Sequence, residues 1–189
     1  MRKDVLFAVA LSAGAVTLSA QTTMPALELR PFAGASIPTG NQRDLFKDAA
    51  LFGVSGAVEV KPTFHLLGSF SWADAKNKYN VSNTNVDIFQ YDAGMEVGLV
   101  RPMGASWELK PFLGIGAGAR TYRFSSDQLS NKTCALGYGA AGSEFQIANL
   151  ALRLEARDNV FCYRSPMVGE KSKTRNDLGF SFGIAYHIR

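Results

Sequence analysis

The chain has 189 residues and a formal net charge of +4, and 47% of its residues are hydrophobic while 19% are charged. This length is typical of one domain or two small ones, and the apolar content excludes wholesale disorder. No run of 18 or more apolar residues follows the N-terminal segment, which excludes a helical membrane protein. The 18 glycines and the aromatic content of 11% favour an all-β chain with many turns.

The N-terminal segment has the features of a secretory signal peptide. Two basic residues, Arg2 and Lys3, precede an apolar or small stretch from Val5 to Val16, and Thr17, Leu18, Ser19 and Ala20 follow, with Leu18 where a small residue is usual. A buried N-terminal helix is the alternative, and the confinement of charge to the extreme start argues against it. The predicted organisation is a signal peptide over residues 1–20 and one domain over residues 21–189. Cleavage removes two basic residues and one acidic residue and lowers the net charge from +4 to +3, which does not indicate nucleic-acid binding.

The remaining chain returns repeatedly to a two-residue alternation of apolar and polar side chains, the pattern of a half-buried strand. For example, Leu109 and Leu113 fall on one face while Lys110 falls on the other. At roughly ten residues each, the alternating stretches have the length that a tilted strand needs to cross a bilayer. In chain order the eight stretches span residues 27–37, 50–61, 64–72, 89–99, 107–120, 134–146, 150–157 and 180–189.

The connections between these stretches alternate in length. Bacterial outer-membrane barrels have short turns on the periplasmic side and long loops outside, and their strand number is even. The pattern therefore predicts an all-β fold, an eight-stranded antiparallel up-and-down transmembrane β-barrel. The long, polar segments are 38–49, 74–86, 123–133 and 161–177, and the short ones are 61–63, 101–106 and 146–149.

Alternation alone does not decide which face points outward, because a soluble barrel would hide its apolar face. Two features favour the membrane orientation. Glycines such as Gly94 and Gly116 share the charged face, where small residues leave room for long side chains inside a narrow ring. Large aromatics such as Phe52 and Trp72 lie near strand ends on the apolar face, as in a membrane–water girdle.

The predicted inner face carries seven acidic and six basic residues, so its sum is −1. An eight-stranded ring has room for side chains and little else, and paired charges cost much less there than isolated ones. We therefore predict a salt-bridge plug rather than a pore lining, although some members, such as Lys61 at a turn, are alternatively explained as solvated. The predicted network comprises Glu28, Glu59, Asp92, Glu96, Glu108, Glu144 and Glu155 with Arg30, Lys61, Lys110, Arg120, Arg153 and Arg157.

Several segments resemble small bacterial outer-membrane β-barrel proteins, which include the OmpA transmembrane domain and the opacity-type porin-like proteins. These segments are the signal peptide, the openings ELRPFAG and ELKPFLG, the stretch LRLEAR and the terminal LGFSFGIAYHIR. The resemblance covers the whole mature chain. It implies a location in the bacterial outer membrane, contact with membrane lipids and lipopolysaccharide, and insertion by the barrel-assembly machinery.

Catalytic, metal and cofactor chemistry have little support in the sequence. Asp92 and Glu96 share one strand face but lie roughly 13 Å apart, too far for a carboxylate dyad. Both histidines, His65 and His187, are placed at the periplasmic rim, away from the outer leaflet. We expect no catalytic residues, no metal ligands and no cofactor.

Two cysteines offer a further candidate feature. Cys134 opens the sixth stretch and Cys162 follows the seventh, at the outer rim of one antiparallel hairpin. Neighbouring strands bring residues within disulfide reach, and export permits oxidation. The sequence predicts a disulfide, with two free thiols as the alternative.

The long loops together carry ten basic and six acidic residues. They would hold lipopolysaccharide phosphates or an acidic partner surface, or would form a solvated, mildly basic rim. The favoured function is a non-enzymatic, monomeric outer-membrane barrel with a structural or surface-interaction role. The alternatives are a narrow channel for ions or small solutes, an outer-membrane lipid-modifying enzyme and a soluble periplasmic binding barrel.

Overall fold

The computed structural model describes residues 26–43, 46–76, 78, 85–104, 107–125, 131–163 and 173–188. The predicted signal peptide lies outside the described residues and stays a prediction. Among the described residues, no helix has the length and apolar character needed to cross a membrane. The long strands are β1 (Leu27–Pro38), β2 (Ala49–Lys61), β3 (Phe64–Lys76), β4 (Asn85–Gly98), β6 (Trp107–Phe124), β7 (Lys132–Ile147), β8 (Leu150–Tyr163) and β9 (Lys173–Ile188), beside the two-residue β5 (Arg101–Pro102) and the 3₁₀ turn η1 (Gly40–Gln42).

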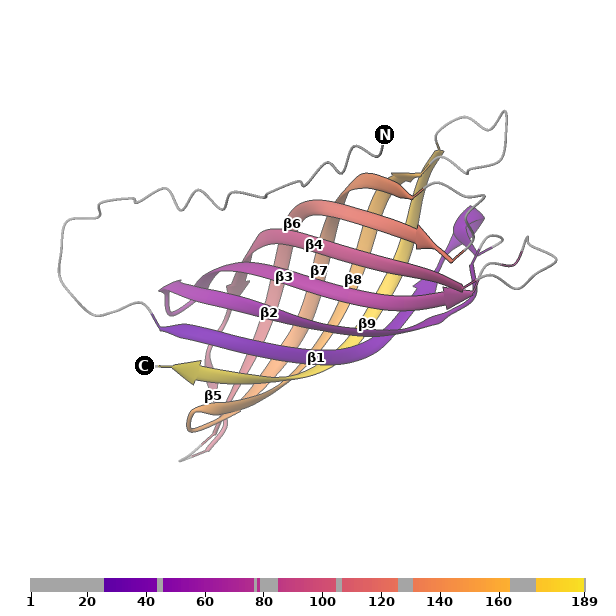
Figure 1. Cartoon of the computed structure of the whole chain (residues 1–189). Helices are drawn as coiled ribbons and strands as arrows, with labels where there is room; N and C mark the ends of the chain where they lie inside the picture. The colour runs from indigo at the N-terminus through magenta and orange to yellow at the C-terminus, as the bar shows by residue number, and fades with distance from the viewer. Residues whose placement is uncertain are drawn as a thin grey trace, which may run out of the picture.

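The eight long strands form one closed antiparallel ring. Consecutive long strands pair with each other, β4 pairs with β6, and β1 pairs with β9 from Leu27 opposite Ile188 onward. Figure 1 shows the tilted strands wound around one axis, with β1 beside β9. Closure leaves no long strand with an unpaired edge, which is the condition for a strand structure to cross hydrocarbon. The predicted eight-stranded barrel is confirmed.

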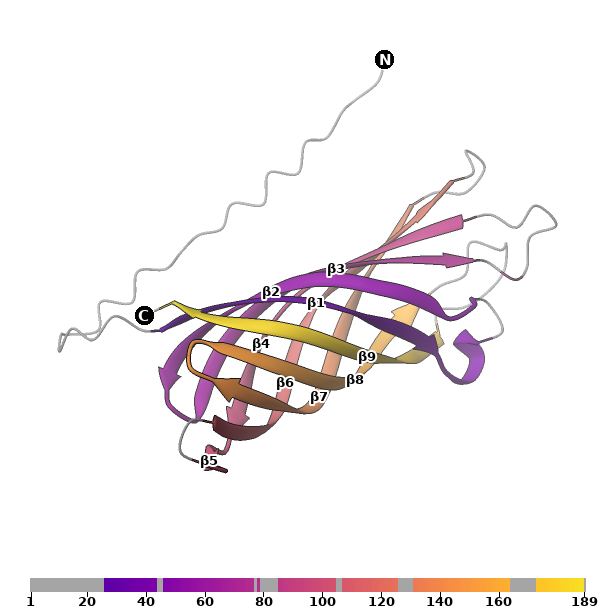
Figure 2. The ribbon, with the colours of Figure 1, turned by 90° about the horizontal axis from the view of Figure 1, so that it is seen from below.

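The connections follow the predicted asymmetry. Pro62 and Thr63 alone join β2 to β3, Ala148 and Asn149 alone join β7 to β8, and the short β5 lies between β4 and β6. The same end of the barrel carries these turns and the end of β9, as the quarter-turned view in Figure 2 also shows. We call this the short-turn end and the opposite one the loop end.

The outer wall is apolar around the whole ring. Leu113 is 69% exposed, Ile115 61% and Leu154 59%, whereas Arg153 and Glu155, which flank Leu154, point inward. A continuous apolar wall of this kind is stable only against hydrocarbon, since in water it would aggregate. The predicted orientation is therefore confirmed. Further members of the wall are Leu29, Phe52, Val54, Leu66, Phe70, Met95, Leu152, Phe180, Phe182, Ile184 and Tyr186.

Toward the loop end the two faces exchange their chemistry. Tyr122, Val86 and Phe161 point inward and are fully or almost fully buried. The outward positions at the same level include exposed Asp74, Arg123 and Asn176. This part of the barrel resembles a soluble one, with a largely apolar inside, in which Arg175 and Gln42 are also buried, and a polar outside.

The exchange of faces corrects five predicted boundaries. The stretches predicted to end at 72, 120 and 157 continue as strand to Lys76, Phe124 and Tyr163. The fourth strand begins at Asn85 rather than 89, and the last begins at Lys173 rather than 180. In these extensions the apolar side chains point inward and the polar ones outward. Because this reverses the pattern of the preceding residues, the sequence predicts loops there. The long connections are correspondingly shorter than predicted.

The position of a residue along the outer face of β9 predicts how strongly a new charge there destabilises the barrel. Ile184→Arg places a cation at the middle of the apolar wall and should lower the free energy of unfolding by about 2–4 kcal/mol. Asn176→Arg, on the same outer face of the same strand but at the loop end, should change it by about 1 kcal/mol or less. Urea unfolding in lipid vesicles measures both. Equal effects of the two substitutions would contradict the assigned depth.

Candidate functional site in the barrel lumen

The short-turn half of the lumen holds an ion cluster that four strands contribute. On β1, Arg30 donates its Nε to Glu28 at 2.8 Å, and its Nη1 lies 3.5 Å from Glu96 of β4. Arg153 of β8 donates its Nη1 to Glu96 at 3.2 Å and to Glu144 of β7 at 3.4 Å. All five side chains are at least nine-tenths buried. Each strand supplies these groups from inward positions, so the two-residue period alone brings them to the axis.

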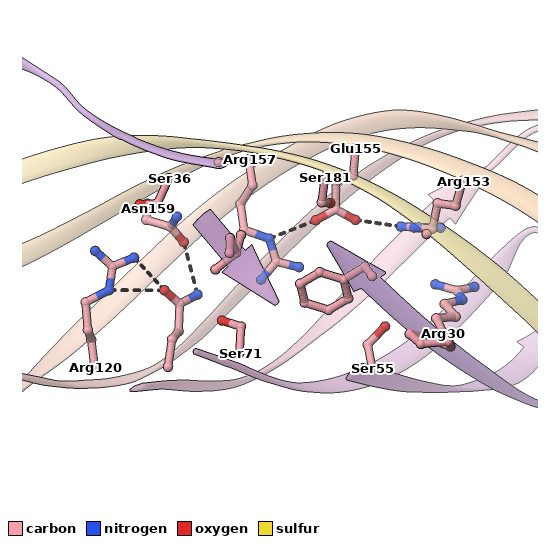
Figure 3. Close-up of a pocket in the computed structure, with 16 residues that line it drawn as sticks. Arg30, Ser36, Ser55, Ser71, Arg120, Arg153, Glu155, Arg157, Asn159 and Ser181 are labelled. Carbon is pink, nitrogen blue, oxygen red and sulfur yellow. Dashed lines mark hydrogen bonds and ion pairs between the residues drawn. The ribbon is translucent and has the colours of Figure 1, made fainter. Parts of the chain in front are cut away.

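The cluster continues without a break through the middle of the lumen. Glu155 accepts hydrogen bonds from Arg153 at 2.9 Å and from Arg157 at 2.8 Å. Arg157 then reaches across to Asp92 of β4 at 3.1 Å. Figure 3 shows Glu155 between the two guanidinium groups.

Amide groups carry the network on toward the loop end. Gln90 donates its Nε2 to Asp92 at 2.9 Å and accepts a hydrogen bond from Arg120 Nε at 3.1 Å. Arg120 pairs with Asp177, which also accepts from Asn159 Nδ2 at 3.0 Å. Hydrogen bonds and ion pairs therefore join Glu28 to Asp177 along most of the barrel axis.

Aromatic rings inside the barrel support the arginines. The guanidinium of Arg153 lies 3.6 Å from the ring centre of Phe112, and that of Arg157 lies 4.0 Å from the ring centre of Tyr138. The Phe112 ring covers Gly142 and the Tyr138 ring covers Gly116, where an added Cβ would collide with the ring. The glycines on the charged face thus make room for rings on which arginines stack.

An apolar layer closes the lumen beyond the network. Phe46, from the connection between β1 and β2, is 3% exposed and stacks on Tyr122 with ring centres 5.7 Å apart. Tyr122 packs against Phe161 in turn, and Arg120 lies over the Phe161 ring at 4.5 Å. The connection is tied down by a hydrogen bond from the Lys47 amide to the Lys76 carbonyl at 3.0 Å. We call Phe46, Tyr122 and Phe161 the apolar cap.

The lumen retains a small polar cavity beside the network. It measures about 50 Å³, and its lining includes Ser55 and Ser71 on one side and Ser181, beside Arg157, on the other (Figure 3). A space of this size has room for roughly three water molecules.

Four of the predicted network residues stand apart from it. Lys61 is exposed, and Glu59, Glu108 and Lys110 are half-buried near the short-turn end. None of the four has an ion pair within the described part of the chain. The other nine predicted residues, Glu28, Arg30, Asp92, Glu96, Arg120, Glu144, Arg153, Glu155 and Arg157, share one network.

The sequence interpretation missed other members. Asp177 fell in a segment expected to be loop, although the inward positions Asp177, Gly179 and Ser181 continue the alternation of β9. The predicted network contains charged residues only, so it leaves out the uncharged Gln90 and Asn159. His65 and His187 were placed correctly at the short-turn end, but their approach to Glu28 was not predicted.

The candidate disulfide does not form in this structure, in which both cysteines are free. Leu136 pairs with Phe161, so Cys134 and Cys162 are offset by one residue across the hairpin. Because alternate residues face opposite ways, Cys134 follows the inward side chains while Cys162 is exposed on the outer face. A disulfide would require a one-residue slip of the strands, which would turn every side chain of one strand to the wrong face.

Removal of an arginine from the network should lower the stability of the barrel, because buried carboxylates lose an ion-pair partner. Arg153→Met leaves the buried Glu96 and Glu144 with only their longer guanidinium contacts to Arg30, at 3.5 Å and 4.0 Å, and should lower the free energy of unfolding by about 3–5 kcal/mol. Lys110→Met removes an inward cation that has no ion pair and should cost about 1 kcal/mol or less. Denaturant titration of the refolded barrel compares them, and similar losses would mean that the ion pairs contribute nothing specific.

The different faces of the cysteines predict different reaction rates with a maleimide. Cys162 should be labelled quickly because it is exposed, and Cys134 slowly because it is half-buried. Mass spectrometry of the unreduced, folded barrel follows both, with the single variants Cys134→Ser and Cys162→Ser as controls. A mass two hydrogens lower that resists labelling would instead establish the disulfide.

Comparison with known proteins agrees with this architecture. A family model described as outer membrane protein beta-barrel domain matches residues 6–189. Neisserial surface protein A aligns with a TM-score of 0.61 at 14% identity, over 85% of this chain and 96% of that one. The N-terminal β-barrel domain of Pseudomonas aeruginosa OprF aligns with a TM-score of 0.53 at 13% identity, over 87% of this chain and 98% of that one. Ail of Yersinia pestis aligns with a TM-score of 0.52 at 16% identity, also over 87% of this chain and 98% of that one. No curated protein matches the sequence, and the structural likenesses show the fold.

Proposed function

The chain belongs to the outer membrane protein β-barrel domain family, and from this premise we propose that it is a non-enzymatic barrel with a sealed interior. Its role is structural or lies in surface interaction, with membrane lipids and lipopolysaccharide as its immediate surroundings. The observation that carries the proposal is the continuous network from Glu28 to Asp177, followed by the apolar cap.

The energetics of the lumen support a plug rather than a pathway. An ion that passes Arg157 and Asp92 has to separate a buried pair whose atoms lie 3.1 Å apart. Breaking such a pair is strongly unfavourable because each charge is left without a partner. Beyond it lies Phe46, which offers a permeating ion no polar group to replace its water.

The alternative of a lipid-modifying enzyme has less support. Such an enzyme works at the outer leaflet, where a base is needed to activate the attacking group. His65 and His187 both lie at the short-turn end, far along the barrel from the loop end. Among the described residues, the loop end presents no histidine to the membrane surface.

Planar-bilayer recording tests the sealed lumen. The purified barrel should insert without a stable open conductance, because the network and the cap together fill the ring. The triple variant Phe46→Ser, Arg120→Ser, Arg157→Ser removes Phe46 from the apolar cap and two links from the network. It should conduct, which shows that the assay detects an opened lumen. Heat-modifiable gel migration verifies that both proteins are folded.

A large and stable conductance of the unmodified barrel would overturn the proposal in favour of a channel. Mass spectrometry of lipid A incubated with the barrel addresses the enzymatic alternative in parallel. Unchanged lipid A is the expected result, and loss or transfer of an acyl chain would assign the barrel a catalytic role.

A further inference from the structure

Two histidines meet carboxylates at the short-turn end of the lumen. His187 of β9 is 4% exposed, and its Nε2 lies 2.8 Å from Glu28 Oε1 and 3.8 Å from Glu144 Oε1. One ligand atom from each of these three residues lies within 4.8 Å of the other two. His65 of β3 approaches the same Glu28 oxygen, with its Nε2 at 3.6 Å. Four strands thus direct donor atoms to one point.

Each carboxylate divides its two oxygens between different neighbours. Glu28 uses Oε2 to accept from Arg30, and Glu144 turns Oε2 toward Arg153 at 3.4 Å. Both Oε1 atoms are left facing His187. The Nε2 of His187 is buried within 3.8 Å of both Oε1 atoms, and its buried Nδ1 makes no hydrogen bond within the described part of the chain. A buried nitrogen without a hydrogen bond is unusual.

The charges around this point do not cancel. Glu28, Glu96 and Glu144 face Arg30 and Arg153, which leaves one negative charge when the histidines are neutral. The half-buried Glu59 and Lys110, which also point inward nearby, leave the balance unchanged. A bound divalent cation would more than offset this negative charge, which by itself is unfavourable in a narrow lumen.

We propose that Glu28, Glu144 and His187 form a binding site for a divalent transition-metal ion, with zinc as its probe. One imidazole nitrogen and two carboxylate oxygens are a donor set that zinc accepts, and water would complete four-coordination. Bonds of about 2.0–2.1 Å in a tetrahedron place donor atoms about 3.3 Å apart, a value that lies between the 2.8 Å and 3.8 Å seen here. This site is independent of whether the lumen is sealed.

Access to the site comes from the short-turn end. A narrow pocket there is lined by Pro62, His65, Lys110 and Glu144. It opens next to the two-residue turn between β2 and β3. A metal ion therefore reaches Glu144 without passing the middle of the ion network or the apolar cap.

Isothermal titration of the refolded, metal-free barrel with zinc chloride tests the proposal. The unmodified barrel should bind one zinc ion. His187→Ala and Glu144→Gln should each weaken binding by at least about tenfold, because each removes a direct ligand. Glu59→Gln is the matched control, as it makes the same charge change at the same end of the lumen and should leave affinity within about twofold.

Cobalt provides a readout that does not depend on affinity. Co²⁺ bound to a mixed nitrogen and oxygen site gives visible absorption bands, and His187→Ala should abolish them in a barrel whose gel migration still shows folding. Glu144→Gln should shift them, since that substitution retains an oxygen donor while changing its strength. Bands that survive in His187→Ala would overturn the assignment.

Other results also exclude the site. Zinc binding that is lost in Glu59→Gln and kept in Glu144→Gln would place the metal with His65 and Glu59, a second group of donor atoms around Glu28. Absence of zinc binding, together with a melting temperature that rises as the pH falls from 8 to 5, would assign the missing positive charge to protons on the histidines.

Discussion

The inside of an eight-stranded ring is too narrow for bulk water, and this constraint governs the rest of the protein. The buried charged side chains of the inner face have little access to water, so they meet opposite charges or amides. Asp92 meets Arg157 across the lumen, and Gln90 links the charges where no counter-ion is in reach. The same two-residue period that sends these groups inward sends Leu113 and Leu154 outward, where only hydrocarbon can cover them.

Arg120 marks the level at which the two halves of the lumen meet. Its guanidinium pairs with Asp177 on the polar side and lies over Phe161, a member of the apolar cap, on the other. Outside the ring, the apolar wall gives way to polar residues toward the same end. The barrel therefore combines a membrane half whose inside is charged and a loop-end half whose inside is largely apolar. Arg120 contacts the interior of both halves.

How much of this the sequence predicts depends on whether the feature is local. The strands and their inward faces follow from a period of two, so Glu28, Arg153 and Glu155 could be assigned to the lumen from the pattern alone. Which of them touch depends on strand tilt and register, which no single strand encodes. Phe46 lies in an irregular segment without periodicity, and Asp177 lies where the alternation changes its sense of burial. The approach of His65 and His187 to Glu28 requires three strands to be placed around one ring.

The choice of arginine for the network follows from the same confinement. A guanidinium stays charged when buried, spans two carboxylates at once and stacks flat on an aromatic ring, none of which a lysine ammonium does as well. Arg153 does all three between Glu96, Glu155 and Phe112, while Lys61 and Lys110 stay outside the network. The ring beneath Arg153 fits only because Gly142 has no side chain. Glycine, aromatic ring, arginine and carboxylate thus act as one packing unit, so the glycines of the inner face are as much a part of the plug as its charges.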